Sequence, residues 1–335
     1  MVVFYALSPT LSVVYVSFSV AYFASFATTP YGFATISNLS FVLSALWREV
    51  AAARGRSTSA VAGELTNGGF PLLLLGASSL SFHKSSDLDD PTHTLDVFAG
   101  WLLVLHLCFC AMSIALLSAP RLLGFSSYWW WLRPLLSIGF ANSVVLLAVF
   151  LDEIYSNQLM FYFSVGPTAA LFGSFCRVLL AEGESGAGIA LFELLVALAA
   201  VTAAIFAQGE LAGRTLTAAT APELYDLFHG TWHVLLSAIA AVVYARVADA
   251  ARLLEGETAP RCVCRLPVLD WLGEALLLLL AVVVLVAKEV EADVGVARAS
   301  IGVCAGLGAV HAVATVVVLW TDRASFFVVS SDEGV

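Results

Sequence analysis

Long apolar runs, separated by short polar stretches, follow one another along almost the whole chain. Ten of them can be recognised, at approximately residues 3–28, 33–47, 68–83, 95–118, 132–151, 158–180, 188–208, 228–247, 269–290 and 299–320. A hydrocarbon core about 30 Å thick is crossed by a helix of about 20 apolar residues. The pattern therefore predicts an all-α fold of ten membrane-spanning helices.

The composition points in the same direction. Of the 335 residues, 60% are hydrophobic and only 12% are charged, and the mean hydropathy is +0.93, which is too apolar for a soluble globular chain. The net charge of -10 comes mainly from acidic loops and an acidic tail, so no basic surface remains for nucleic acid. We expect an integral multi-pass protein of an endomembrane or the plasma membrane that binds no nucleic acid.

Basic residues predict the orientation, because Lys and Arg concentrate in cytoplasmic loops. If all ten runs span, eleven of the 15 basic residues fall on one side, and only Lys84, Arg214, Lys288 and Arg298 fall on the other. Both termini are then expected in the cytosol. The loop after the third run and the start of the eighth run lie on the lumenal or extracellular side.

Three polar clusters interrupt the apolar pattern on that lumenal side, at residues 78–90, 92–100 and 225–233. On a helix, residues four apart share a face, so His229 and His233 point the same way and Ser79 lies one turn before His83. Polar side chains in a spanning helix are costly, and they normally face the bundle interior and mark a functional site. The histidines of the first and third clusters are therefore expected at one depth of the bundle.

Neutral imidazole is the commonest zinc ligand, and a catalytic zinc ion typically has three protein ligands and a water molecule. We predict that His83, His229 and His233 ligate Zn²⁺. Asp96 is expected to take a proton from the water or to orient a histidine, and Ser79 to donate a hydrogen bond to a developing oxyanion. The chemistry indicated is hydrolysis of a lipid amide or ester that enters from the bilayer.

A purely structural interpretation stands beside this one. In it, His229 caps a helix start, His233 bonds to a loop carbonyl, and Asp96 interacts with the dipole at the start of its segment. The remaining histidines are interpreted as loop or packing residues; they are His93, His106 and His311. The motif Gly302 to Gly306 is typical of close helix packing.

These residues resemble the CREST superfamily of seven-helix membrane proteins, which includes alkaline ceramidases, progestin and adiponectin receptors, GPI-remodelling phospholipases and myomaker. The resemblance rests on Ser79 and His83 at a helix end, Asp96 opening the next helix, and "HGTWH" (229–233) opening a late one. It implies a zinc ion on the three histidines, with the serine and aspartate beside it. In the enzymatic members it implies hydrolysis of a lipid amide or ester.

The resemblance covers residues 31–250 as a seven-helix core. Outside this core we expect a transmembrane helix in residues 1–30, two further transmembrane helices in 251–322, and an acidic cytosolic tail in 323–335. "TISNL" (35–39) looks like the first core helix of ceramidases and of the myomaker group. The acidic calcium-binding segment that precedes this helix in ceramidases is missing, because the chain reads "ATTPYGF" there (27–33).

Two other functions remain open. The first is a receptor or membrane-remodelling protein that keeps the zinc ion as a structural element. The second is a transporter with a polar relay of Asn142, Glu193 and Glu274, although these residues share no common spacing.

Overall fold

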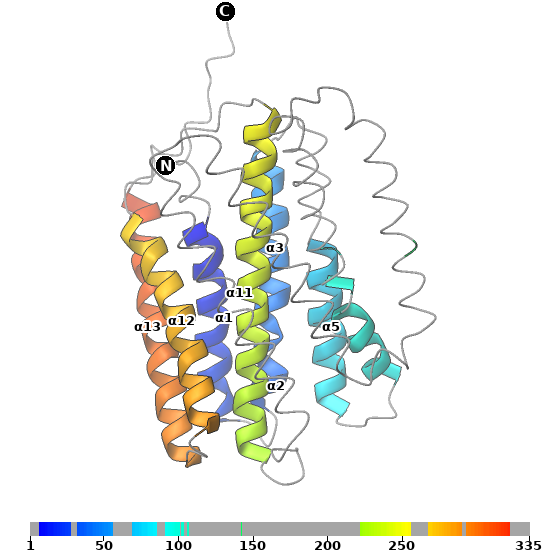
Figure 1. Cartoon of the computed structure of the whole chain (residues 1–335), viewed down its shortest axis with the longest axis vertical. Coiled ribbons are helices and arrows are strands. Elements are labelled where there is room, and N and C mark those ends of the chain that lie inside the picture. The colour runs from blue at the N-terminus through cyan, green and yellow to red at the C-terminus, as the bar shows by residue number, and fades with distance from the viewer. Residues whose placement is uncertain are drawn as a thin grey trace, which may run out of the picture.

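The computed structural model describes residues 7–27, 32–55, 69–85, 91–100, 102, 103, 106, 142, 222–255, 267–289 and 293–321. These residues are almost entirely α-helical and include no β-strand, which confirms the all-α class for this part of the chain (Figure 1). The runs predicted at 132–151, 158–180 and 188–208 lie outside the described residues, except for Asn142, which is helical and exposed.

The labelled helices agree with six of the ten apolar runs, because α2 and α3 share one of them. They are α1 (Leu7–Ser25), α2 (Gly32–Ser37), α3 (Leu39–Gly55), α5 (Gly69–Ser85), α11 (Pro222–Glu255), α12 (Pro267–Glu289) and α13 (Val294–Thr321). Residues 91–100 are also helical, as are 102, 103 and 106.

Two elements differ from the apolar pattern. The run 33–47 is broken at Asn38 into α2 and α3, with the Asn38 amide donating to the carbonyl oxygens of Ala34 at 2.9 Å and Thr35 at 3.2 Å. The run 228–247 is the middle of α11, whose 34 residues correspond to a length of about 51 Å. Proline begins this helix, where its missing N–H has no intrahelical role. The domain boundary expected after residue 250 falls within the last turns of α11.

The terminal helices are part of the bundle. α1 contacts α13, α3, α2, α11 and α12, so it lies between the α12–α13 pair and the α3–α11 pair (Figure 1). Side chains of α1 also bond to the backbone of its neighbours: the Tyr15 hydroxyl donates to the Gly273 carbonyl at 2.6 Å, and the Ser19 hydroxyl to the Ala305 carbonyl at 2.7 Å. The helices α1, α12 and α13 therefore pack as part of the same bundle as α2, α3 and α11.

α13 is apolar on all sides. Its stretch Val294–Val318 is long and apolar enough to cross a bilayer, and it is the one helix among the described residues that meets this test. Small side chains such as Ala297 and Ala305 are buried against the bundle, whereas Val310 and Val313 are each 63% exposed. A helix with apolar residues on both its packed and its outer face is typical of a lipid environment.

The glycine motif of α13 packs at one end only. A Cβ at Gly302 would lie 3.0 Å from the Tyr22 hydroxyl oxygen, so the close approach of α1 and α13 leaves little room for a side chain there. At Gly306 a Cβ would meet no atom of the described residues within 4 Å. The predicted packing role is confirmed for Gly302, whereas the described helices leave Gly306 uncovered.

Candidate metal centre

Two of the predicted ligands lie on one face of α11. His229 and His233 are one turn apart, and their ring centroids are separated by 4.6 Å. His233 is almost fully buried and His229 partly buried. α11 begins at Pro222, two turns before His229, so His229 does not cap this helix.

The third predicted ligand comes from the last turn of α5. The Nε2 atom of His83 lies 3.0 Å from the Nε2 atom of His229, and its ring centroid is 5.1 Å from that of His233. One ligand nitrogen from each of the three rings lies within 4.8 Å of the other two. The structure thus brings together three imidazoles that could hold a metal ion.

α5 can reach this position because it packs closely on α3. A Cβ at Gly76 would lie 2.7 Å from the Val42 side chain, so only glycine allows the two helices to approach this far. The Thr35 hydroxyl of α2 donates to the His83 carbonyl at 3.4 Å, which ties the end of α5 to α2. His83 is therefore held by its backbone as well as by its helix.

His233 is fixed through its other ring nitrogen. Its Nδ1 atom lies 3.1 Å from the Ala34 carbonyl oxygen and 2.9 Å from the Ser37 hydroxyl oxygen. A carbonyl oxygen only accepts hydrogen bonds, so Nδ1 carries the proton and the lone pair belongs to Nε2. Metal-ligating histidines almost always donate their second N–H to a carbonyl or carboxylate in this way. The carbonyl expected under the structural interpretation is present, but it also completes a metal ligand.

Asp96 and Ser79 lie next to each other beside this cluster. Ser79 is buried one turn before His83, and its side chain is within hydrogen-bonding reach of the Asp96 carboxyl. Asp96 is the sixth residue of the helical stretch 91–100, beyond the first turn, where the dipole interaction expected under the structural interpretation would act. Its Oδ1 atom is buried and has no hydrogen-bond partner within the described part of the chain. A buried acceptor without a donor costs about 1–3 kcal/mol, so this oxygen is suited to receive a bond from a bound water or ligand.

The donor set fits a zinc ion. Nitrogens bound to zinc at about 2.0–2.1 Å in a tetrahedron lie about 3.4 Å from one another. The spacings of 3.0 Å and up to 4.8 Å found here bracket that value. Asp96 does not belong to the group of close ligand atoms, and its described neighbour is Ser79, one turn before His83.

The other histidines lie outside the cluster. His93 packs on Phe82, with ring centroids 4.4 Å apart. His106 is buried, with its Nδ1 atom 2.7 Å from the Tyr244 hydroxyl, and His311 packs edge-on against Tyr15 at 5.4 Å. Their predicted roles as packing residues agree with these contacts, although His93 lies in the first turn of a helix and not in a loop.

The sequence analysis did not identify the groups that hold His233. Ala34 acts through its backbone, and Ser37 lies 196 residues from the ring that it contacts. No local pattern signals either contact. Tyr225, whose ring stacks on His229 with centroids 5.1 Å apart, was recognised only as part of a polar cluster.

The chain was compared with known proteins. It matches no protein-family model, and the searches of curated proteins and of solved structures give no significant match. The functional argument therefore depends on the residues themselves.

Proposed function

We propose that this protein is a zinc-dependent intramembrane hydrolase of the CREST type that cleaves a lipid amide or an acyl ester. The observation that carries the proposal is the meeting of His83, His229 and His233 within 4.8 Å, with the buried Ser79 one turn before His83 and the partly buried Asp96 next to that serine. Three histidines and an adjacent acid–base residue form the typical protein part of a hydrolytic zinc site.

In this proposal the three histidines hold the ion through one ring nitrogen each. A zinc ion there would polarise the substrate carbonyl and lower the pKa of water to about 7. Asp96 accepts a proton from the attacking water and returns it to the leaving amine or alcohol. Ser79 donates a hydrogen bond to the carbonyl oxygen as it gains negative charge. The products are a fatty acid and the amine or alcohol to which it was joined.

The proposal includes a multi-pass topology, which suits a lipid substrate. The outer face of α13 is apolar, and α1 and the middle of α12 add shorter apolar stretches beside it. On α11, His233 lies three turns after the start and Arg252 near the end, a separation of about 28 Å along the axis and close to the hydrocarbon thickness. We propose that the arginine end faces the cytosol and that the histidines lie near the lumenal or extracellular interface.

The test combines metal analysis with lipid hydrolysis. Full-length protein purified in detergent should contain one zinc ion per chain, and His233→Ala should lose both the zinc and the release of fatty acid from ceramides, phospholipids or GPI lipids. His93→Ala is the matched control, since it removes a neighbouring histidine that lies outside the cluster. Protein without stoichiometric metal, or His233→Ala with full activity, would refute the proposal. Zinc without fatty-acid release from any of these lipids would instead favour a receptor or remodelling protein with a structural metal.

A further inference from the structure

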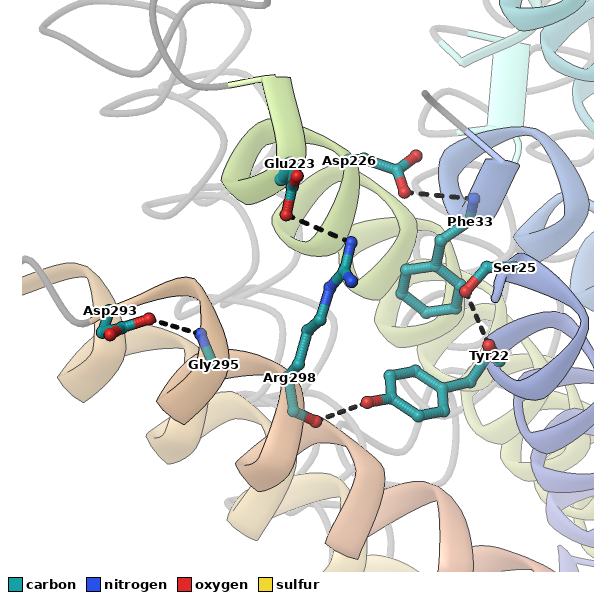
Figure 2. A network of polar contacts seen from close by, with 8 residues as sticks. All are labelled: Tyr22, Ser25, Phe33, Glu223, Asp226, Asp293, Gly295 and Arg298. Atoms are coloured by element: carbon teal, nitrogen blue, oxygen red, sulfur yellow. Dashed lines mark hydrogen bonds and ion pairs between the residues drawn. The ribbon is translucent and has the colours of Figure 1, made fainter. Parts of the chain in front are cut away.

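The short helix α2 is capped from another helix. The Asp226 carboxylate of α11 accepts the backbone N–H group of Phe33 at 3.2 Å (Figure 2). It also accepts the backbone N–H group of Ala34 at 2.8 Å. These N–H groups belong to the first turn of α2, where no intrahelical acceptor exists. A carboxylate is a good acceptor there because it also complements the helix dipole. In most helices the cap is a local residue, but this one is 192 residues away.

The capped residues are the ones that hold His233. Ala34 receives the Asp226 carboxylate on its N–H, and its carbonyl oxygen accepts the bond from His233 Nδ1 at 3.1 Å. One turn later the Ser37 hydroxyl contacts the same nitrogen at 2.9 Å. Asp226 and His233 therefore act on opposite ends of a six-residue helix.

The fit between α2 and α11 leaves little freedom. The ring of Phe33 covers Gly230, where a Cβ would come within 2.5 Å of the ring. On its other side Phe33 contacts Tyr22 and Phe18 of α1, with ring centroids 5.7 Å and 6.0 Å away. Thus α2 packs against both α1 and α11, and Asp226 bonds to its first turn.

The surrounding contacts tie the same region to α13. The Tyr22 hydroxyl donates to the Arg298 carbonyl, and the Arg298 guanidinium pairs with Glu223 at 3.3 Å (Figure 2). Glu223 is one turn before Asp226 on α11 but is 60% exposed, and its carboxylate pairs with Arg298 of α13. It therefore provides a control for the loss of a nearby carboxylate.

We propose that Asp226 is a positioning residue of the metal centre: by capping α2 it holds Ala34 and Ser37 where they fix the His233 ring with Nε2 directed at the other two histidines. This inference rests on the proposed metal site, because it assigns to Asp226 an effect on ligand geometry. Partners that orient metal ligands typically change metal affinity 10- to 100-fold when they are mutated.

The first experiment measures zinc affinity by chelator competition on full-length protein in detergent. Asp226→Ala should weaken binding 10- to 100-fold. Asp226→Asn should give an intermediate value, because the amide oxygen still accepts one N–H group. Glu223→Gln should bind like the wild type.

The second experiment determines the tautomer of the His233 ring in metal-free protein. In metal-free protein labelled with ¹⁵N-histidine, His233 should show a single Nδ1–H tautomer, and Asp226→Ala should convert it to a mixture while the signals of His106 and His311 stay unchanged. If Asp226→Ala does not fold, Asp226→Asn is the variant that decides. Wild-type affinity together with an unchanged His233 signal would overturn the positioning role. A wild-type protein that binds no zinc would refute the proposed function, and the tautomer measurement would still decide the role of Asp226.

Discussion

His83 Nε2 lies 3.0 Å from His229 Nε2, although 146 residues separate the two in sequence. Two imidazole nitrogens at this distance either share a proton, with one ring donating an N–H to the lone pair of the other, or direct both lone pairs at one cation. A shared metal ion satisfies both nitrogens together with that of His233. The pair is thus the geometric basis of the proposed site.

Replacing His83 should show whether this residue is a metal ligand or only a packing residue. His83→Ala is expected to lower zinc affinity at least about 100-fold, because two protein ligands remain of three. His83→Cys should restore much of the affinity, since a thiolate is also a zinc ligand. Cobalt binding to His83→Cys should add a sulfur-to-metal charge-transfer band that the wild type lacks. Equal affinities for His83→Ala and the wild type would remove His83 from the site.

Asp96 should affect turnover more than metal binding. Asp96→Asn keeps the size of the side chain but removes the proton acceptor, so kcat is expected to fall about 10²- to 10⁴-fold. The zinc content should stay near one per chain, because Asp96 is not among the close ligand atoms. Both quantities can be measured on the same preparation. Loss of the metal in Asp96→Asn would make this residue a ligand and contradict the assignment.

Ser37 should influence the metal through His233. Ser37→Ala removes one of the two contacts to Nδ1, and because the Ala34 carbonyl remains, we expect zinc affinity to fall about 10-fold, at the lower end of the range for such partners. Ser237→Ala is the control: Ser237 is equally buried, one turn after His233, and its hydroxyl bonds to the Val234 carbonyl at 3.0 Å. Chelator competition on both variants checks the difference. An equal loss of zinc affinity in the two variants would mean that it results from a less stable helix and not from a changed orientation of the His233 ring.

Two glycines should respond in opposite ways to alanine. A Cβ at Gly230 would lie 2.5 Å from the Phe33 ring, so Gly230→Ala should destabilise the fold by about 1–3 kcal/mol and weaken zinc binding as α2 is displaced. Gly306→Ala meets no described atom within 4 Å and should be neutral or slightly stabilising, because alanine is the better helix former. Thermal unfolding in detergent, followed by metal titration, tests the pair. A neutral Gly230→Ala would show that α2 and α11 are not in close contact.

The parts of the fold that follow from short-range periodicity could be predicted from the sequence. The four-residue spacing of His229 and His233 requires only that this stretch be helical, and the apolar runs indicate where α5, α12 and α13 lie. The meeting of His83 with the late pair needed more than spacing. It was expected from the polar clusters at run ends and from the resemblance to the CREST pattern.

Long-range side-chain to backbone contacts could not be predicted in this way. In the sequence, Asp226 is an ordinary acidic residue near a helix start. No feature of the neighbouring sequence indicates that it caps α2. No proline or glycine stands at Asn38 to indicate that the helix breaks there. The break is stabilised by hydrogen bonds from the Asn38 side chain to carbonyl groups of α2. Such features depend on how α1, α2 and α11 pack, which apolar periodicity does not determine.

Removing the metal should loosen the bundle where its helices meet the ion. A ligand that binds only the folded state stabilises it by RT ln(1 + [L]/Kd), which is about 2.7 kcal/mol at a free concentration 100 times Kd. Here the ion would join α5 to α11, because His83 belongs to α5 and the other two histidines belong to α11. Chelation should therefore lower the unfolding temperature of the wild type, and added zinc should restore it. His233→Ala, which has lost a ligand, should show a smaller shift or none, whereas His93→Ala should behave like the wild type. An identical response of the wild type and His233→Ala would place the zinc effect elsewhere in the protein.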